Sequence, residues 1–398
     1  MQKILLLIAS LFYFNFILAE NEIKSWQGIH ETPLSRLEQQ FAEPPVEFAN
    51  HVIWGWEGKM DKKTICNDLD SIKKKGFRAV IFEAGYKLPF KYLSEEWFKA
   101  IRTGVLEAKK RGMKVWIIDE GKYPSGFAGG KFSQERPDLR MQALVIGDTI
   151  QIKRGEVMTN HKIAPEIISA VAVSTSGAPN RTVEINNGKI SFNAGLDDWK
   201  ILLVKSDFRT AVTRAVNNPN GGKDATNSLC DYLNPIAVQQ FIDWTHKQYK
   251  KYLGKELGTT VLGFRGDEPD YAHLPWTPSI VQTFKETKGY DPTPYLASFF
   301  TASPTIQEQR VKADYWDVWS SLFATHFFKL QADWCAANGV AHITHLNKEH
   351  EMPACVKAEG DYFRALSKVQ IPGVDAIWNQ IWPSTLNDFP KLASSVAH

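Results

Sequence analysis

The chain has 398 residues, a length that suits two or three domains or one large α/β barrel. Its 47 Lys and Arg residues nearly balance its 44 Asp and Glu residues, and no basic stripe stands out, which argues against a nucleic-acid partner. The four cysteines, Cys66, Cys230, Cys335 and Cys355, show no C-x-x-C or zinc spacing. A large core does not need disulfides, so we expect free, buried thiols.

The N-terminus carries the pattern of a secretory signal peptide. Lys3 precedes an apolar run over residues 4–18, and Ile17-Leu18-Ala19 supplies a small-residue cleavage site. A membrane anchor is the alternative, but the run is shorter than the ~20 residues that a bilayer span needs. We therefore predict a signal peptide over residues 1–19 and a secreted or periplasmic protein, with no membrane association once the signal is removed.

Residues 20–48 form a polar lead-in that contains prolines, and a regular alternation of strands and helices follows it. Apolar runs and helical periodicity predict strands at 51–56, 77–85 and 113–121 and helices at 62–76 and 94–112. Ser94 is the expected N-cap of the second helix. Continuous apolar strands joined by helices favour a parallel sheet covered on both faces. This first part of the α/β unit covers residues 49–140.

The alternation stops between residues 141 and 225, where short β-like runs are separated by turn signals such as Asn186-Asn187-Gly188. This segment predicts a small antiparallel β module inserted into the α/β unit. The second part of that unit, residues 226–398, predicts helices at 234–254 and 305–338 and strands at 260–269, within 340–351 and at 373–381. We therefore predict an α/β fold of the (β/α)₈ TIM-barrel type, incomplete, with about six βα units.

Polar side chains follow the carboxyl ends of nearly every predicted strand, which is where parallel barrels place their functional groups. The candidates are Trp54, Trp56, Asp119, Glu120, Tyr123, Asp267, Glu268, His345, Asn347, Glu349, His350 and Asn379. A single acid at a strand end commonly accepts hydrogen bonds from the next helix. Acids at several neighbouring strand ends instead favour glycoside hydrolysis, in which two carboxyl groups flank the scissile bond. The tryptophans offer flat apolar faces on which sugar rings stack.

Glu268 is the predicted general acid. Like-charge repulsion from Asp267 favours its protonated form, and Pro269 ends the strand and fixes the carboxyl group. Glu349 is the predicted second carboxylate, and Glu351, two residues further on, is its competitor. The remaining candidates are expected to bind the substrate or to orient a carboxylate.

The same acids allow a metal-binding interpretation. Asp119, Glu120, Asp267, Glu349 and Glu351 could hold a hard cation such as Ca²⁺, although no H-E-x-x-H or EF-hand spacing is present. The residues establish no cofactor, and they leave the metal ligands unknown. A metal-dependent hydrolase and a non-catalytic carbohydrate-binding protein therefore stay open as alternatives.

Several stretches together resemble the family 106 glycoside hydrolases, the α-L-rhamnosidase type, and their bacterial relatives. They are Ile53-Trp54-Gly55-Trp56, IIDEGKYPSGFAGG (117–130), DEP (267–269), Pro275-Trp276-Thr277-Pro278, AEGDY (358–362) and VQIPGVDAIWNQIWP (369–383). The resemblance implies a (β/α)₈ enzyme that removes terminal sugars from a polysaccharide or glycoconjugate with inversion. It makes Glu268 the general acid and Glu349 the general base, and it implies calcium-assisted sugar binding. Family members usually continue beyond the equivalent of His398, so we expect two barrel strands fewer than they have.

Overall fold

The computed structural model describes residues 33–43, 50–121, 123–209, 213–214, 223–224, 228–271, 274–302, 305–377, 381, 384 and 387–398. The predicted signal peptide, most of the lead-in and Asn379 lie outside these residues. In the lead-in, the structure describes α2 (Leu34–Ala42), which has no buried residue. None of the described helices combines the length and the apolar character that a membrane span requires.

A parallel sheet is the centre of the fold. Within the described part of the chain, six strands form it in the order β1-β2-β3-β13-β15-β16, and every neighbouring pair is parallel. The bounds are β1 (His51–Trp56), β2 (Ala79–Ala84), β3 (Lys114–Ile118), β13 (Val261–Arg265), β15 (Ala341–Thr344) and β16 (Ile371–Pro372). The predicted parallel α/β arrangement is confirmed. Among the described strands, β1 and β16 each have one neighbour in this sheet, so these strands do not close a barrel.

The sixth strand is shorter than predicted and begins earlier. The strand expected at 373–381 is not formed over residues 373–377, because pairing with β15 ends at Pro372. Proline has no backbone N–H with which to continue the ladder. Gly373 then donates its N–H to the carbonyl of Thr344 at 2.7 Å. The backbone after Gly373 is irregular as far as Ile377, and it carries Asp375 to the end of the sheet.

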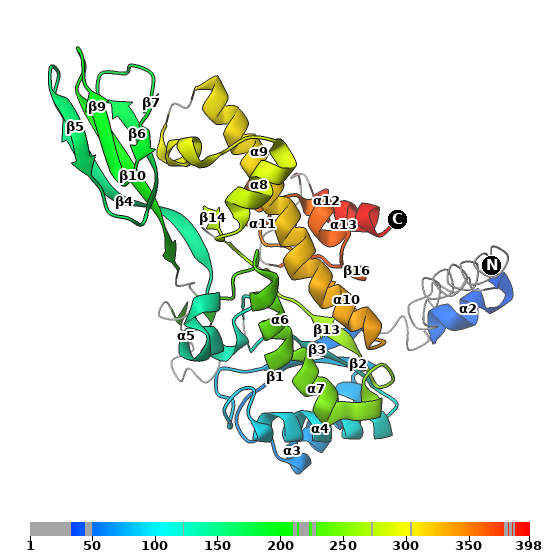
Figure 1. Cartoon of the computed structure of the whole chain (residues 1–398). Coiled ribbons are helices and arrows are strands. Elements are labelled where there is room, and N and C mark those ends of the chain that lie inside the picture. The colour runs from blue at the N-terminus through cyan, green and yellow to red at the C-terminus, as the bar shows by residue number, and fades with distance from the viewer. Residues whose placement is uncertain are drawn as a thin grey trace, which may run out of the picture.

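Helices flank the sheet (Figure 1). They are α3 (Lys62–Lys74), α4 (Glu95–Lys110), α6 (Pro235–Trp244), α7 (His246–Leu253), α9 (Ile306–Phe323) and α10 (Lys329–Ala337). Asp61, Ser94 and Asn234 each accept a hydrogen bond from a backbone N–H in the first turn of α3, α4 and α6. Ser94 therefore has the capping role that the sequence predicts.

Two of the predicted helices are interrupted. The helix expected at 234–254 breaks at Thr245, whose ψ of −86° is not helical. Its hydroxyl donates to the carbonyl of Phe241 at 2.7 Å, and this local bond competes with a continuous helix. The helical region expected at 305–338 contains a π-helical turn, Ala324–Phe328, between α9 and α10.

The segment between β3 and β13 contains the antiparallel module. Its strands are β4 (Gln142–Ile152), β5 (Val157–Lys162), β6 (Ile167–Ser174), β7 (Arg181–Thr182), β8 (Ile185–Asn186), β9 (Lys189–Asn193), β10 (Trp199–Phe208), β11 (Thr213–Arg214) and β12 (Lys223–Asp224). β10 pairs antiparallel with both β4 and β6, as the turn signals predict. The sheet that contains β4, β10 and β6 has a further strand, β14 (Pro275–Trp276), which pairs with β4. This strand lies beyond the predicted limit of the module at residue 225. Figure 1 shows the module projecting away from the parallel sheet.

Short helices and turns complete the fold. They are η2 (Ala128–Gly130), α5 (Lys131–Glu135), η3 (Pro137–Leu139), η4 (Gly254–Glu256), α8 (Ile280–Lys288), η5 (Thr293–Phe300), α11 (Met352–Glu359), α12 (Tyr362–Leu366) and α13 (Phe389–Ala397). All four cysteines are free thiols. Cys66 is half-buried and the other three are buried.

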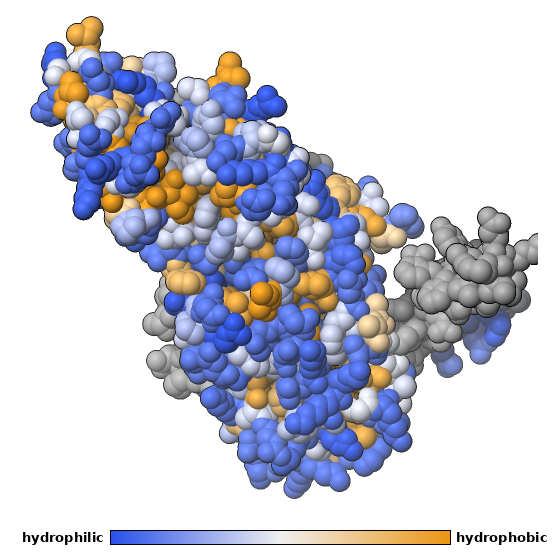
Figure 2. Space-filling model, in the orientation of Figure 1, coloured by the Kyte–Doolittle hydropathy of each residue, from blue (hydrophilic) through white to orange (hydrophobic). Residues whose placement is uncertain are grey.

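The two faces of the parallel sheet have different environments. Trp56, Phe82 and Ile117 belong to a large core beneath the helices, and each is at most 1 % exposed. Trp116 and Leu262 belong to a smaller apolar cluster that does not include these residues. Figure 2 shows a mostly hydrophilic surface over the end of the molecule where α3 and α4 lie. The helices therefore separate the larger core from solvent.

Candidate active site

Three strand ends meet around one imidazole. His345 follows β15, and its side chain is only 3 % exposed. Its Nε2 lies 3.5 Å from Oδ1 of Asp267, 3.6 Å from Oε1 of Glu268 and 3.9 Å from Oδ2 of Asp375. Among the described residues, this nitrogen has no hydrogen-bond partner. Asp267 and Glu268 follow β13, and Asp375 follows β16. These residues meet because the carboxyl ends of parallel strands share one edge of the sheet.

Glu349 lies beside this cluster and is 2 % exposed. Its Oε1 accepts the backbone N–H of Asp375 at 2.5 Å, whereas its Oε2 is buried with no partner among the described residues. Burial raises the pKa of Glu349 to about 7, and the interaction with His345 acts in the opposite direction. Glu268 therefore contacts His345 directly, and Glu349 is linked to the same imidazole through Asp375.

Two non-glycine residues of the site have left-handed backbones. Glu268 has a φ of 37° and Lys348, next to Glu349, has a φ of 57°. Residues other than glycine rarely adopt this conformation, and each residue held in it costs roughly 1–3 kcal/mol of folding free energy. The surrounding structure therefore holds both predicted glutamates in loops whose conformation their own sequence does not favour.

Asp119 positions the loop that follows β13. Its Oδ1 accepts the hydroxyl of Ser125 at 2.7 Å, and Ser125 Oγ accepts the backbone N–H of Asp267 at 2.7 Å. The Asp119 side chain is fully buried, and this burial raises its pKa to about 7. Direct contact with a substrate, which the sequence predicted, is incompatible with this burial. Asp119 instead acts on the site through Ser125.

Glu120 holds the glycine-rich loop that follows β3. Its carboxylate accepts the backbone N–H groups of Gly121 at 2.5 Å and of Gly129 at 3.1 Å, and also that of Ala128. The side chain is 1 % exposed, and desolvation raises its pKa to about 8. The predicted substrate contact is therefore wrong for Glu120 as well, because its oxygens face its own loop.

A second polar group lies next to the glutamates. Asn347 Nδ2 donates to the hydroxyl of Tyr123 at 3.1 Å and to Oδ2 of Asp270 at 2.9 Å. The backbone N–H of Asn347 donates to Oε1 of Glu359 at 2.9 Å. Burial raises the pKa of Glu359, and the charges of Asp270 and Glu268 raise it further. Tyr123 and Asn347 thus lie in the site, as predicted.

Trp54 and Trp56 do not contribute to this site. Trp56 is fully buried, and both indoles pack against Phe82 with ring centroids 5.5 and 5.0 Å apart. Successive side chains of a strand point to opposite faces, so these two residues share the face beneath the helices. The side chain of Ile53 points to the opposite face of the sheet. The predicted stacking of sugars on Trp54 and Trp56 is therefore wrong.

His350 lies at the edge of the site. Its Nε2 is 3.9 Å from Oε1 of Glu351, and both residues line an adjacent cavity of about 1090 Å³. The side chain of Glu351 is 68 % exposed. Glu349 is buried next to Asp375, so it fits the second carboxylate better than Glu351 does.

Sequence reasoning missed Asp375, Asp270 and Glu359. Asp375 carries a signal that could have been found, because it comes three residues after the true end of β16. It was overlooked because the predicted strand placed it in mid-strand. Asp270 directly follows the DEP stretch, and Glu359 belongs to AEGDY, but an acid in a loop or at a helix end has no signal of its own.

Comparison with known proteins places the chain in a family. A family described as "alpha-L-rhamnosidase", glycoside hydrolase family 106, matches residues 160–398. A curated relative, "Putative beta-glucuronidase" of Formosa agariphila, is 23 % identical over 92 % of this chain and 34 % of its own length. A solved structure, that of a rhamnosidase from Novosphingobium sp. PP1Y, matches with a TM-score of 0.61 and 14 % identity over 86 % of this chain and 49 % of its own.

The chain thus spans about a third of the curated relative and about half of the solved structure. At 14 % identity, the solved structure is evidence for a shared fold. The family match extends over more than half of the chain, and it contains both predicted glutamates and the other acids around His345. The chain therefore belongs to glycoside hydrolase family 106.

Proposed function

We propose that the protein hydrolyses the glycosidic bond of a terminal sugar, with Glu268 and Glu349 as its acid/base pair. One observation carries the proposal: Glu268 contacts His345, and Glu349 accepts the N–H of Asp375, whose carboxylate lies 3.9 Å from the same imidazole. The reaction needs one carboxyl group that is protonated and one that is ionised. Because the pKa of Glu349 is about 7, this group can lose or hold a proton near neutral pH.

The resemblance to the family implies that Glu268 is the acid, that Glu349 is the base, and that the anomeric configuration inverts. Glu268 is partly open to solvent, with 19 % of its side chain exposed, so a leaving-group oxygen can reach it. Glu349 is more enclosed, and its buried Oε2, which has no partner among the described residues, would accept a hydrogen bond from a water molecule enclosed with the substrate. Inversion requires carboxyl groups about 6.5–9.5 Å apart, with space for that water between them.

A panel of 4-nitrophenyl glycosides tests the proposal. The α-L-rhamnoside is the first choice because of the family, and the β-D-glucuronide is the second because of the curated relative. We expect Glu268→Gln to lose natural substrates but to keep part of its activity on leaving groups that need no protonation. Glu349→Gln should lose both, with partial recovery in azide, and NMR of the first product should show inversion. Sugar binding without hydrolysis of any glycoside in the panel would instead identify a non-catalytic binding protein.

A divalent cation is the alternative occupant of the same cluster, because Glu268 as a metal ligand would be ionised and could not act as the general acid. One ligand atom each from Glu268, His345 and Asp375 lies within 4.8 Å of the others, and the imidazole nitrogen has no other partner among the described residues. Two carboxylates and one imidazole suit Mn²⁺ or Zn²⁺, whereas Ca²⁺ would need further oxygens from water or from the sugar. A cation there would orient sugar hydroxyls. Thermal shifts with each ion, compared between wild type and His345→Ala, test this site, and equal shifts in both proteins would refute it.

We further propose that the six parallel strands belong to a barrel of the (β/α)₈ type. Their consecutive order and the likeness to the rhamnosidase structure support this interpretation. Export through the predicted signal peptide is also a proposal. N-terminal sequencing of protein recovered from the periplasm or the culture medium should begin at Glu20, and recovery of the intact residues 1–19 on exported protein would refute it.

A further inference from the structure

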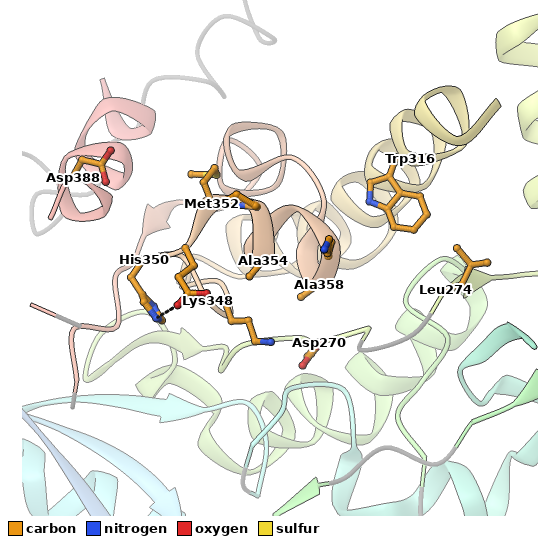
Figure 3. A pocket seen from close by; sticks show the side chains of 12 residues that line it. Asp270, Leu274, Trp316, Lys348, His350, Met352, Ala354, Ala358 and Asp388 are labelled. Carbon is orange, nitrogen blue, oxygen red and sulfur yellow. Dashed lines mark ion pairs between the residues drawn. The ribbon is translucent and has the colours of Figure 1, made fainter. Parts of the chain in front are cut away.

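A groove leads away from the predicted glutamates. Its inner part is the cavity of about 1090 Å³, and its outer part is a cavity of about 770 Å³. The two cavities share lining residues, among them Leu274, Trp316 and Met352, so they lie next to each other. In Figure 3, the shared residue Trp316 lies at the end of the inner cavity opposite His350, with α11 between them.

The inner part of the groove adjoins the site. Asp270, which lines it, accepts a hydrogen bond from Asn347 at 2.9 Å. Lys348 and His350, the two chain neighbours of Glu349, also line it. An enzyme that removes a terminal sugar encloses that sugar and leaves one direction for the rest of the glycan. A groove continuous with such a site can therefore hold only the leaving-group side of the substrate.

The groove becomes more positive toward its outer end. Three acids, Asp270, Glu351 and Asp388, line the inner part together with Lys348 and Lys357. Lys357 also lines the outer part, where Lys312 joins it and no acid lines the cavity. Neither lysine of the outer part forms an ion pair with any residue that the structure describes. An anionic group would therefore be attracted most strongly at the outer end.

Lys312 is a cation in an apolar setting. Its Nζ lies 5.8 Å from the centre of the Phe299 ring, and burial lowers its pKa. Glu308 is the acid that acts on it, but that carboxylate already accepts the backbone N–H of Thr305 at 2.6 Å and closes the cap of α9. An arriving anion would thus be an additional partner for Lys312.

The floor of the outer part is apolar. Trp316 is half-buried, and it presents its indole to both cavities together with Met352. Aromatic faces next to cations are suited to a sugar ring that carries a negative charge, because the ring stacks while the charge is paired.

We propose that this groove is a leaving-group subsite for an acidic sugar, one that carries a carboxylate or a sulfate ester. This inference rests on the proposed function, because it takes the site at the glutamates to hold the terminal sugar. The enzyme would then cleave a neutral terminal sugar from an acidic glycan and would discriminate against neutral glycans.

Calorimetric titration of the full chain tests the subsite. The probes are tetragalacturonic acid for the carboxylate, a κ-carrageenan tetrasaccharide for the sulfate ester, and neutral maltotetraose, all at low salt. We expect at least one acidic probe to bind about tenfold more tightly than maltotetraose, and this preference to shrink as salt screens the lysines. Which acidic probe binds identifies the anion.

The double variant Lys312→Ala/Lys357→Ala should lose most of the preference for the acidic probe and keep its affinity for maltotetraose within twofold. Lys200→Ala, an exposed lysine on β10, is the matched control and should change neither affinity. Maltotetraose binding as tightly as both acidic probes, or an unchanged preference in the double variant, would overturn the subsite. Lysine-dependent binding without hydrolysis of any glycoside would support the groove and refute the proposed function.

Discussion

Replacing Glu349 by glutamine should make the protein more stable at alkaline pH. The amide oxygen can accept the N–H of Asp375 in place of Oε1, and the amide has nearly the same shape as the carboxyl group. The pKa of Glu349 rises on folding from 4.5 to about 7. Such a rise corresponds to roughly 3 kcal/mol of preference for the neutral form.

The sign follows from proton binding. Between pH 4.5 and 7, the folded protein holds a proton at Glu349 that the unfolded chain has released. The free energy of unfolding therefore falls as the pH rises through this range, and the full penalty applies above pH 7. Glutamine does not ionise. The variant should accordingly match the wild type near pH 4 and exceed its stability by about 2–3 kcal/mol at pH 8.

Urea unfolding at pH 4, 6 and 8 measures this difference, with EDTA present so that no bound cation contributes. Glu351→Gln is the matched control: its side chain is 68 % exposed, and it should shift stability by less than about 0.5 kcal/mol at every pH. A Glu349→Gln variant that is less stable than the wild type at pH 8, or whose gain does not depend on pH, would refute the reasoning.

Three further substitutions test the architecture around the site. Asp231→Ala removes the buried acceptor of the hydroxyls of Tyr271 and Thr277, and it should cost about 3–5 kcal/mol in urea unfolding. Gly263→Ala places a Cβ 2.0 Å from the carbonyl oxygen of Ala341 and should lower stability by about 3 kcal/mol, so an unchanged melting temperature would contradict the strand packing. Trp54→Ala should cost about 2–4 kcal/mol while oligosaccharide affinity stays within twofold, and a selective loss of binding would return Trp54 to the site.

The first helices were predictable because their signals are local. Ser94 caps α4, and the predicted bounds of α3 and α4 differ from the observed ones by at most two residues. The strand at 371–372 was not predictable in the same way. Its two residues become a strand only because β15 lies beside them, and the apolar run after them suggested a later start. Pairing with β15, which is distant in sequence, thus sets the position of this strand, and the local sequence pattern does not.

The predicted strand ends indicated which polar side chains meet at His345. The sequence did not indicate which face of the sheet a strand residue occupies. Glu268, His345 and Glu349 were found because each follows an apolar run. Trp54 and Trp56 follow the same rule in sequence, but their alternation alone does not say which face of the sheet they occupy. Their partner Phe82, on the neighbouring strand, is what places them beneath the helices.

The buried carboxyl groups of the site differ from a buried carboxyl group elsewhere in the fold. Glu256, 3 % exposed and remote from the strand ends described above, pairs with Lys109 at 2.8 Å, and this contact lowers its pKa. Around the site, by contrast, one oxygen each of Glu349 and Glu359 and Nε2 of His345 are buried without a partner among the described residues. An unpaired buried polar group costs about 1–3 kcal/mol. Such a cluster lowers the stability of the fold unless a ligand supplies partners, and the many hydroxyls of a sugar, or a cation that bridges to them, would do so.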